Sequence, residues 1–450
     1  MLKRTVAFLA AMSVAFLAFS GFGPLFRPSP RGEGALPAPG SVPRAVGDLS
    51  NAAAIRLFEE RIERNPADAV SYTILGQLHI SRARETGDVS SYQRAETALQ
   101  RALELLPNYT PAAASLGAAF YAEHRFTDAL EQARQVYEGD SKATQALATM
   151  GDAYLALGQY REAERAYQEL ALAGSNPAIL ARLAQLEWLR GNAEWALELM
   201  QGAASRELQS GRTGEAVAWY QVRLGDLHFA GGRLEEAAAH YEAAFDLFDG
   251  YYLALAGLGK VRAAEGRYDE AIDLYEQAVA VIPLPATLAA LGDLYAKIGE
   301  TAQARLQYDT VEAIAKLQAF NRQLYNRRLV LFYADHDLKV SEALELACNE
   351  LDVRKDIYGY DVLAWALHKN GRHREAADAI EQAMRLGTRD AALYYHAGMI
   401  QAGLGDNDQA QELLTEALAI NPHFDPLQAE LAQATLVRLG AGVEGEGASS

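Results

Sequence analysis

The chain has 450 residues and a formal net charge of −18 at pH 7. Ala, Leu, Glu, Gln, Arg and Tyr are common and Val and Ile are sparse, which favours helix almost throughout and disfavours a sheet-rich fold. The negative charge has no basic stripe to offset it, which opposes nonspecific binding to nucleic acid or anionic lipid, so no nucleic-acid partner is expected. Cys348 is the only cysteine, which excludes an intrachain disulfide framework.

Residues 1–26 have the pattern of an export signal or a single membrane anchor. Lys3 and Arg4 precede an uncharged run over residues 5–26. Residues 18–20 (Ala-Phe-Ser) offer a small-x-small cleavage site, but the run of 22 residues is also long enough to span a bilayer. We therefore expect an exported protein that is secreted or periplasmic after cleavage, or anchored in the membrane and facing the extracytoplasmic space. Retention of the anchor is slightly favoured.

A tether is predicted next, over residues 27–48. The stretch from Pro24 to Gly47 contains six Pro and four Gly, a composition that cannot pack closely against a helix. Ala54, Phe58 and Pro66 then follow at the spacing of the second helix of a repeat. Residues 49–68 are therefore predicted to form a capping half repeat.

A step of 33 or 34 residues recurs along the chain. Gly117 and Gly151 are 34 residues apart, as are Gly225 and Gly259, and Gly292 follows 33 residues later. Small residues keep the same step in a second register, in the pairs Ala129 and Ala163, Ala237 and Ala271, and Ala271 and Ala304. Self-similarity at this period is typical of a repeat protein built from stacked units.

One unit, residues 252–283, shows the pattern in full, with Leu255, Leu258, Gly259, Gly266, Tyr268, Ala271, Tyr275, Ala278 and Pro283. These residues resemble the tetratricopeptide repeat, in which helix A and helix B pack as an antiparallel pair. Gly259 and Ala271 are small because the two helices approach closely there. Gly266 ends helix A, as a residue with positive φ does. Tyr275 is expected to fill the groove toward the next pair, as are its equivalents Tyr167, Tyr241 and Tyr308.

The resemblance implies an all-α, right-handed superhelical solenoid with capping helices at both ends. We predict about ten helix pairs over residues 69–423. Residues 424–440 are predicted as the closing helix and residues 441–450 as a flexible tail. Helix A of successive pairs is expected to begin near Ala69, Thr110, Thr144, Pro177, Ala218, Tyr252, Pro285, Leu324, Ile357 and Ala391.

The final hundred or so residues also resemble the end of a widespread group of exported bacterial tetratricopeptide proteins. The resemblance implies a bacterial, exported repeat scaffold and no particular reaction.

The repeats leave no stretch of the size that a catalytic domain needs. The sequence has no glycine-rich phosphate loop, no His-Glu-x-x-His, no Gly-x-Ser-x-Gly and no paired-cysteine zinc pattern. No catalytic residue, cofactor or metal ion is expected. Asp335, His336 and Asp337 are interpreted as a solvated turn, and a hydrolase that uses Asp335 and His336 is the least favoured function.

In the tetratricopeptide fold, inward-facing positions of helix A line a concave surface where a partner binds. These positions are mostly small in the second and third repeats, as in Ala114, Ala118, Ala148 and Ala156, and become aromatic further on, as in Trp188, Trp219 and Phe229. Aromatic residues beside a few charges are typical of binding hot spots. Packing of some of these aromatics into the core is the alternative that stays open. The predicted partner-binding residues are Tyr325, Arg328, Phe332, Tyr358, Asp361, Trp365, His368, Lys369, Tyr395 and Met399.

These features predict a non-catalytic scaffold or assembly factor that binds a protein or peptide in a bacterial envelope. The alternative is a carbohydrate- or lipid-binding accessory protein, because Trp and Tyr faces also suit sugars. A protein or peptide bound through charges is released as the salt concentration rises, whereas a sugar stacked on aromatic rings is not, so salt dependence separates the two hypotheses. The Lys and Asn clamp by which co-chaperones of this fold hold a C-terminal carboxylate is absent, since Ala148, Asp152, Ala289 and Asp293 occupy its positions.

Overall fold

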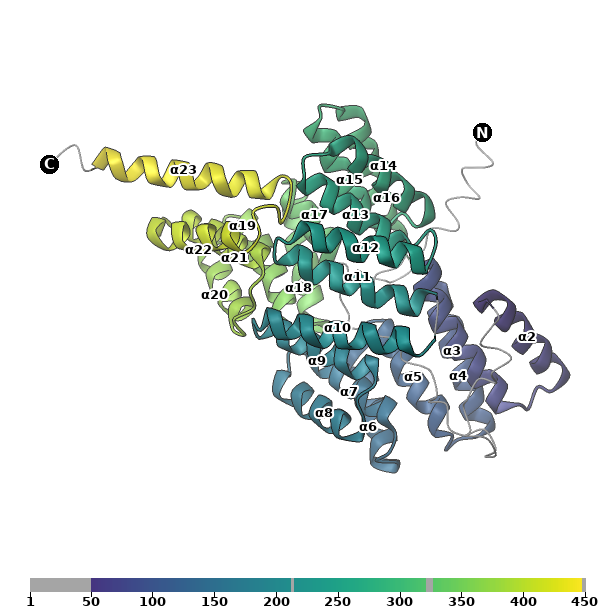
Figure 1. Ribbon diagram of the computed structural model, residues 1–450. Helices are drawn as coiled ribbons and strands as arrows, with labels where there is room; N and C mark the ends of the chain where they lie inside the picture. Colours follow the sequence, from purple (N-terminus) through teal and green to yellow (C-terminus); the bar gives the residue numbers. More distant parts are fainter. Residues whose placement is uncertain (1–49, 212–213, 321–326, 447–450) are drawn as a thin grey trace. The chain divides into compact units, whose positions relative to one another are not determined.

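The computed structural model describes residues 50–211, 214–320 and 327–446, which hold 22 helices and no strand (Figure 1). The predicted signal or anchor (1–26), the predicted tether (27–48) and Tyr325 lie outside the described residues. No helix in the described part of the chain is long and apolar enough to cross a membrane.

Ten consecutive helix pairs follow one N-terminal helix, as predicted. The helices that correspond to helix A are α3 (Ala69–Thr86), α5 (Thr110–Ala122), α7 (Thr144–Ala156), α9 (Pro177–Leu189), α11 (Glu215–Ala230), α13 (Tyr252–Ala264), α15 (Pro285–Lys297), α17 (Arg327–Asp335), α19 (Ile357–Lys369) and α21 (Ala391–Leu404). Eight of these begin at the residue that the repeat count gives. The exceptions are α11, which begins three residues before Ala218, and α17, whose predicted start at Leu324 is not described.

The helices that correspond to helix B are α4 (Ser90–Leu105), α6 (Phe126–Gly139), α8 (Tyr160–Ala173), α10 (Ala193–Gln209), α12 (Leu234–Leu247), α14 (Tyr268–Val281), α16 (Thr301–Phe320), α18 (Val340–Val353), α20 (His373–Met384) and α22 (Asn407–Ile420). The turn glycine predicted at Gly266 has a positive φ, and a glycine with positive φ also stands in the A–B turn of other pairs, for example at Gly158, Gly232, Gly299, Gly371 and Gly405.

The two terminal helices are α2 (Asn51–Arg64) and α23 (Gln428–Glu446). Ala54 and Phe58 of α2 pack against Ile74 of α3 and Ala98 of α4, so α2 covers the apolar face of the first pair. At the other end, the helix continues past Gly440 to Glu446, whereas the sequence analysis placed the start of a flexible tail at residue 441; residues 447–450 of that predicted tail lie outside the described residues. The glycines in this stretch lower helix propensity without forbidding a helix, and no proline interrupts it.

The chain divides into two compact units, and each is described by itself. Unit 1 ends at Arg182 and unit 2 begins at Leu183, so the boundary falls within α9. Unit 1 contains the pairs from α3 to α8 and the first part of α9. Unit 2 contains the rest of α9 and every later helix.

One contact between helix A and helix B recurs in four pairs, one of unit 1 and three of unit 2. The helix A glycine lies against the ring of a tyrosine in helix B, and a Cβ atom added to Gly151 would lie 2.3 Å from the Tyr167 ring. Gly225 with Tyr241, Gly259 with Tyr275 and Gly292 with Tyr308 repeat the contact. The Tyr241 ring also lies against Gly257 of the following helix A, as expected for a residue that fills the groove toward the next pair. The glycine is therefore required because the tyrosine ring takes the space of a side chain.

The aspartate that follows this glycine accepts a hydrogen bond from the same tyrosine. The hydroxyl of Tyr167 donates to Asp152, that of Tyr241 to Asp226 and that of Tyr308 to Asp293, each over 2.7 Å. A buried hydroxyl needs such a partner, because an unpaired one costs about 1–3 kcal/mol. The repeat therefore fixes a Gly-Asp pair in helix A to a tyrosine in helix B.

Candidate functional site

The large aromatic residues predicted to bind a partner lie mostly in the core of unit 2. Phe332, Trp365 and Tyr395 are only 4%, 2% and 1% exposed, and Asp361 is also buried. This corrects the prediction that these four side chains face a partner, because no partner can reach them in this structure. The same inward positions are covered by neighbouring helices and by Phe424, whose ring lies 5.5 Å from that of Tyr395.

Trp365 is held by the helices on both sides of α19. Its indole nitrogen donates to Asp335 over 2.7 Å, and its ring stacks on His396 at 4.4 Å between centroids and on His368 at 5.0 Å. Burial is the main reason that the pKa of Asp335 rises to about 6. Ala334, Leu414 and Ala432 complete the apolar cluster that contains Trp365. The aromatic excess of this repeat therefore serves packing between α17, α19 and α21.

Two histidines tie successive A helices to each other through carboxylates. Nδ1 of His396 lies 2.8 Å from Asp361, and Nε2 of His336 lies 2.6 Å from Asp293. Burial alone would lower the pKa of both histidines, but the carboxylate beside each outweighs burial and raises it.

Asp335 and His336 therefore belong to two separate contacts instead of forming an acid-base pair, and both side chains are partly buried, Asp335 at the end of α17 and His336 in the turn that follows. Asp337 alone of this cluster is exposed in the turn, where it pairs with Lys369 over 2.8 Å.

The remaining predicted residues, Arg328, Tyr358, His368, Lys369 and Met399, stay partly exposed. The hydroxyl of Tyr358 accepts a hydrogen bond from the indole of Trp188 and donates one to Asp390, each over 3.2 Å. Trp188 precedes Tyr358 by 170 residues. An early repeat of unit 2 therefore contacts a late one at an inward-facing residue.

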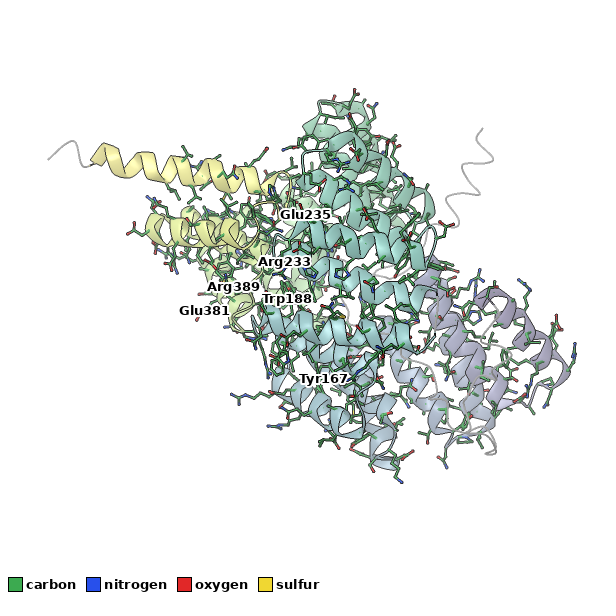
Figure 2. All side chains as sticks on the ribbon, viewed as in Figure 1. Tyr167, Trp188, Arg233, Glu235, Glu381 and Arg389 are labelled. Carbon is green, nitrogen blue, oxygen red and sulfur yellow. The ribbon has the colours of Figure 1, made fainter. Side chains whose placement is uncertain are left out.

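Three further contacts join early and late repeats of unit 2 in the same way. The hydroxyl of Thr388 donates to the carbonyl of Leu189, and the amide of Asn421 donates to the carbonyl of Phe229 over 2.7 Å. Lys297 donates to the carbonyl of Pro426 over 2.9 Å. We call these and the Trp188–Tyr358 bond the closing contacts; Trp188 and Arg389, labelled in Figure 2, flank the Leu189–Thr388 contact.

The closing contacts could not be found from the repeat pattern, which relates each unit only to its neighbours. They join residues 129 to 199 positions apart. Their consequence is that the inner face of unit 2 is bounded by α9 and α11 on one side and by α19 and α21 on the other.

The inner face of unit 2 also holds a lysine that the sequence analysis missed. Lys260 follows the helix A glycine of α13, where Asp152, Asp226 and Asp293 stand in other pairs. Its side chain is exposed, and its ammonium lies 4.8 Å from the ring centroid of Phe229. The signal was present in the sequence, because "LGKVR" breaks the pattern of "MGDAY", "LGDLH" and "LGDLY".

Enclosure by the surrounding helices, ahead of repulsion by Arg328 and Arg223, lowers the pKa of Lys260 to about 8. Arg223 itself bonds to Asp226 and lies 5.8 Å from the ring centroid of Trp219. Cations and aromatic rings from α11, α13 and α17 therefore meet on one face.

Family models match the chain in four places. Models of the tetratricopeptide repeat match residues 120–186, 222–284, 359–382 and 391–424. The chain contains tetratricopeptide repeats. None of the curated proteins compared with the chain matches it in sequence.

Several solved structures are similar to the chain. Yeast Tom70 is 15% identical, with 86% of this chain and 92% of that chain covered and a TM-score of 0.38. A tetratricopeptide repeat protein from Parabacteroides merdae is 17% identical, with 51% and 86% covered and a TM-score of 0.39. The Cut9–Hcn1 hetero-tetramer of the APC/C gives 15% identity, 86% and 93% coverage and a TM-score of 0.33. Identities this low carry no information on partners.

The tetratricopeptide repeats of unit 1 present a different inner face. Ala114, Ala118, Ala148 and Ala156 are buried, in line with the small residues found there in the sequence. Asp152 is also buried, and it accepts two bonds from Arg182, over 2.8 and 2.7 Å, beside the one from Tyr167, which Figure 2 labels. The charge of Asp152 is therefore balanced by Arg182 within unit 1.

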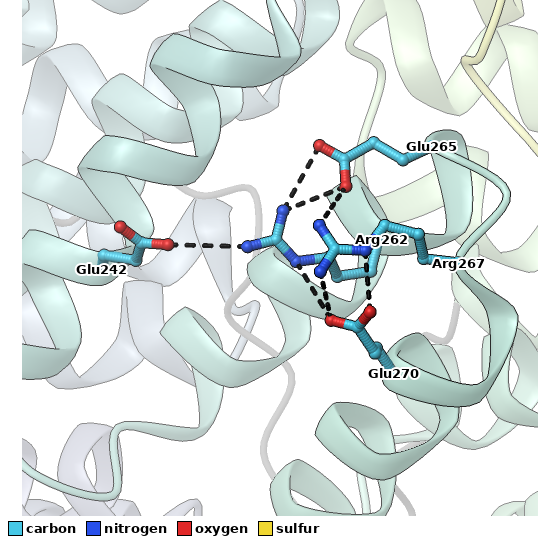
Figure 3. Close-up of polar contacts among 5 residues, drawn as sticks. All are labelled: Glu242, Arg262, Glu265, Arg267 and Glu270. Atoms are coloured by element: carbon cyan, nitrogen blue, oxygen red, sulfur yellow. Dashed lines mark hydrogen bonds and ion pairs between the residues drawn. The ribbon is translucent and has the colours of Figure 1, made fainter.

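Figure 3 shows a different group of charges, at the turn between α13 and α14. Arg262 pairs with Glu265 over 3.0 Å and lies 3.6 Å from Glu242, and Arg267 pairs with Glu270. Partly exposed pairs of this kind contribute about 0–1 kcal/mol each. Both arginines of this group are therefore engaged by glutamates of the same group. Among the described residues, no group of three or more His, Cys, Asp or Glu side chains is arranged to hold a metal ion.

Proposed function

We propose that the chain is a non-catalytic scaffold that binds a partner protein on the inner face of unit 2. Tetratricopeptide repeats are in general protein-interaction modules, which supports the coarse assignment. The inner face of unit 2 is chosen because its inward-facing residues differ from those of unit 1. Unit 1 has buried alanines at its inward positions, whereas Trp219, Lys260, Arg328 and Tyr358 of unit 2 keep exposed surface there.

Aromatic and cationic side chains on one surface are what protein hot spots contain. Trp, Tyr and Arg dominate such sites because they bury a large area and can still form hydrogen bonds. The alternative, a carbohydrate- or lipid-binding protein, needs open aromatic faces. Trp365 and Tyr395 do not supply them because both are buried. A protein partner is therefore the better match to the side chains that remain accessible.

The proposal places this activity on the exported side of a bacterial membrane. The support is the sequence of residues 1–26, with its two cations and long uncharged run, and the resemblance of the final hundred residues to exported bacterial proteins. Determining the N-terminus of the mature protein decides between an anchor and a cleaved signal. Recovery of the chain in the cytosolic fraction with residues 1–26 intact would contradict export.

A matched pair of tryptophan variants tests the binding face. Trp219 lies on the inner face, partly exposed beside Arg223, whereas Trp195 lies on helix B of an earlier repeat and is 53% exposed. The full-length chain and its Trp219→Ser and Trp195→Ser variants are used as bait in an extract of the producing cells. We expect Trp219→Ser to lose the captured protein and Trp195→Ser to retain it.

Equal retention of the captured protein by the two variants would place the binding face elsewhere. Melting curves of both variants show whether a loss reflects unfolding. Raising the salt concentration then separates the two classes of ligand, since a protein held by Lys260 and Arg328 is released and a stacked sugar is not.

A further inference from the structure

The aspartate that follows the helix A glycine has a defined structural task. Asp152, Asp226 and Asp293 each hold the hydroxyl of a tyrosine in helix B, and two of them also bind a cation from the next helix A: Arg182 bonds to Asp152 and His336 to Asp293. At the corresponding place in α13 the charge is reversed to Lys260. Packing does not account for the change, because Gly259 and Tyr275 keep the contact found in the other pairs.

Lys260 has no ionic partner of its own. Among the described residues its ammonium forms no hydrogen bond or ion pair, and its one close contact is the ring of Phe229. The two carboxylates that act on it from across the inner face are already engaged. Asp390 binds the backbone N–H of Ala392 at the start of α21 as well as Tyr358.

The second of these carboxylates, Asp425, starts α23 in the same manner. It accepts hydrogen bonds from the backbone N–H groups of Leu427 and Gln428, each over 2.8 Å. A carboxylate that caps a helix is held by the backbone and cannot move to meet a lysine. Lys260 therefore keeps its donors free.

Like charges surround Lys260 although the protein as a whole is acidic. Arg223 of α11 and Arg328 of α17 both repel its ammonium. Repulsion between cations on three different A helices opposes folding, although Arg223 is also bonded to Asp226. An arrangement of this kind gains stability when an anionic group binds between the cations.

We propose that Lys260, beside Arg223 and Arg328, anchors a carboxylate of an acidic segment of the partner protein. The inference rests on the proposed function and names the chemistry that the inner face of unit 2 recognises. A charge-assisted hydrogen bond from the ammonium holds the carboxylate, and the two guanidinium groups add attraction. The positive inner face also draws an acidic segment toward a protein that otherwise repels it.

The sharpest variant is Lys260→Asp, because it introduces the residue that this position has in the three other pairs with the Gly–Tyr contact, as Asp152, Asp226 and Asp293. Aspartate there can accept the hydroxyl of Tyr275, so the variant should melt no lower than the unchanged chain. Lys260→Met removes only the charge and keeps the apolar stem. Lys142→Asp, in an exposed connection of unit 1, makes the same change in net charge away from the inner face.

The probe is a fluorescent oligo-glutamate peptide, with an oligo-glutamine peptide of equal length as its control. Fluorescence anisotropy measures binding to the full-length chain and its variants at low and raised salt. We expect oligo-glutamate to bind and to dissociate as salt is raised. Lys260→Met should weaken binding at least about tenfold and Lys260→Asp further, with Lys142→Asp unchanged.

Equal affinity of the unchanged chain and Lys260→Asp for oligo-glutamate would overturn the inference. So would the absence of binding by the unchanged chain, or equal binding of the glutamine peptide. If the captured protein is nevertheless lost from Trp219→Ser and kept by Lys260→Asp, the proposed function stands and only the carboxylate anchor fails. If both Trp219→Ser and Lys260→Asp keep the captured protein, the proposed function itself is wrong.

Discussion

The two units are built from the same kind of helix pair, but different residues line the inner face of each unit. In unit 1 the inward positions are alanines such as Ala118 and Ala148, and a buried ion pair joins Asp152 to Arg182. In unit 2 the same positions carry aromatic, acidic and basic residues, and the closing contacts join its early repeats to its late ones. The Gly–Tyr contact occurs in one pair of unit 1 and in three pairs of unit 2, so the two units share a way of packing helix A on helix B although their inward positions differ.

The largest effect should follow loss of Trp365, which tests whether this residue is core. Removing a buried Trp side chain costs about 3–5 kcal/mol, and Asp335 also loses its donor. Trp365→Ala should therefore destabilise unit 2 severely. Trp195→Ala, on the surface, should change the free energy of unfolding by less than about 0.5 kcal/mol. Urea unfolding followed by circular dichroism measures both, and a mild effect of Trp365→Ala would return this residue to the list of partner contacts.

Asp152→Ala tests the buried ion pair of unit 1. Leaving Arg182 buried without its partner should cost about 3–5 kcal/mol. All four tryptophans lie in unit 2, so their fluorescence reports that unit alone, whereas amide hydrogen exchange of α7 reports unit 1. We expect faster exchange in α7 with little change in the tryptophan transition. Exchange in α7 as slow as that of the control Asp140→Ala, at an exposed position, would show that the pair contributes little.

A smaller loss is expected when one closing contact is removed. Asn421→Ala leaves the carbonyl of Phe229 without its donor in a buried place, which costs about 1–3 kcal/mol. The tryptophan transition of unit 2 should move to lower urea, while Asn407→Ala, at an exposed position of α22, should leave it in place. Identical transitions for the two variants would mean that the early and late repeats of unit 2 are not held together by this bond.

The smallest expected effect is a dependence on pH that has opposite signs in the two units. Burial lowers the pKa of His396 in unit 2, but Asp361, with Asp335 and Asp390 behind it, raises it by more, so the pKa is raised overall. Its stabilisation is therefore complete below about pH 6.5 and is lost as the pH rises through the folded-state pKa. Burial, ahead of Arg94 and Arg82, lowers the pKa of His79 in unit 1 to about 4. Its stabilisation is present above about pH 6.5 and is lost as the pH falls toward 4.

Variants of the two histidines isolate these contributions from those of other groups. The stability difference between the unchanged chain and His396→Gln should shrink as the pH is raised from about 6.5, and that for His79→Gln should shrink as the pH is lowered from the same point. Tryptophan fluorescence follows the first and hydrogen exchange of α3 the second. The same sign for both variants would refute the assignment of one charged and one neutral histidine.

The repeat and its boundaries could be predicted because they depend on local anchors. Gly259 and Tyr275 belong to one pair, so their spacing in the sequence is enough to place them. The burial of Trp365 could not be predicted, because it depends on His396 and Ala432 from later helices. The position of a residue in helix A indicates that the residue points inward, but it does not indicate whether another part of the chain covers that residue. Lys260 could be found in the sequence only as a departure from the Gly-Asp pair, because a single lysine does not stand out among aromatic residues as a binding residue.

Photo-crosslinking from Trp219 tests the central claim most directly. A photo-reactive aromatic amino acid replaces Trp219 or Trp195 in the full-length chain, and the producing cells are irradiated. If the inner face of unit 2 holds the partner, position 219 gives a cross-linked product with the protein captured by the unchanged chain, and position 195 gives none. A product from position 195 alone, or the same product from both positions, would contradict the account.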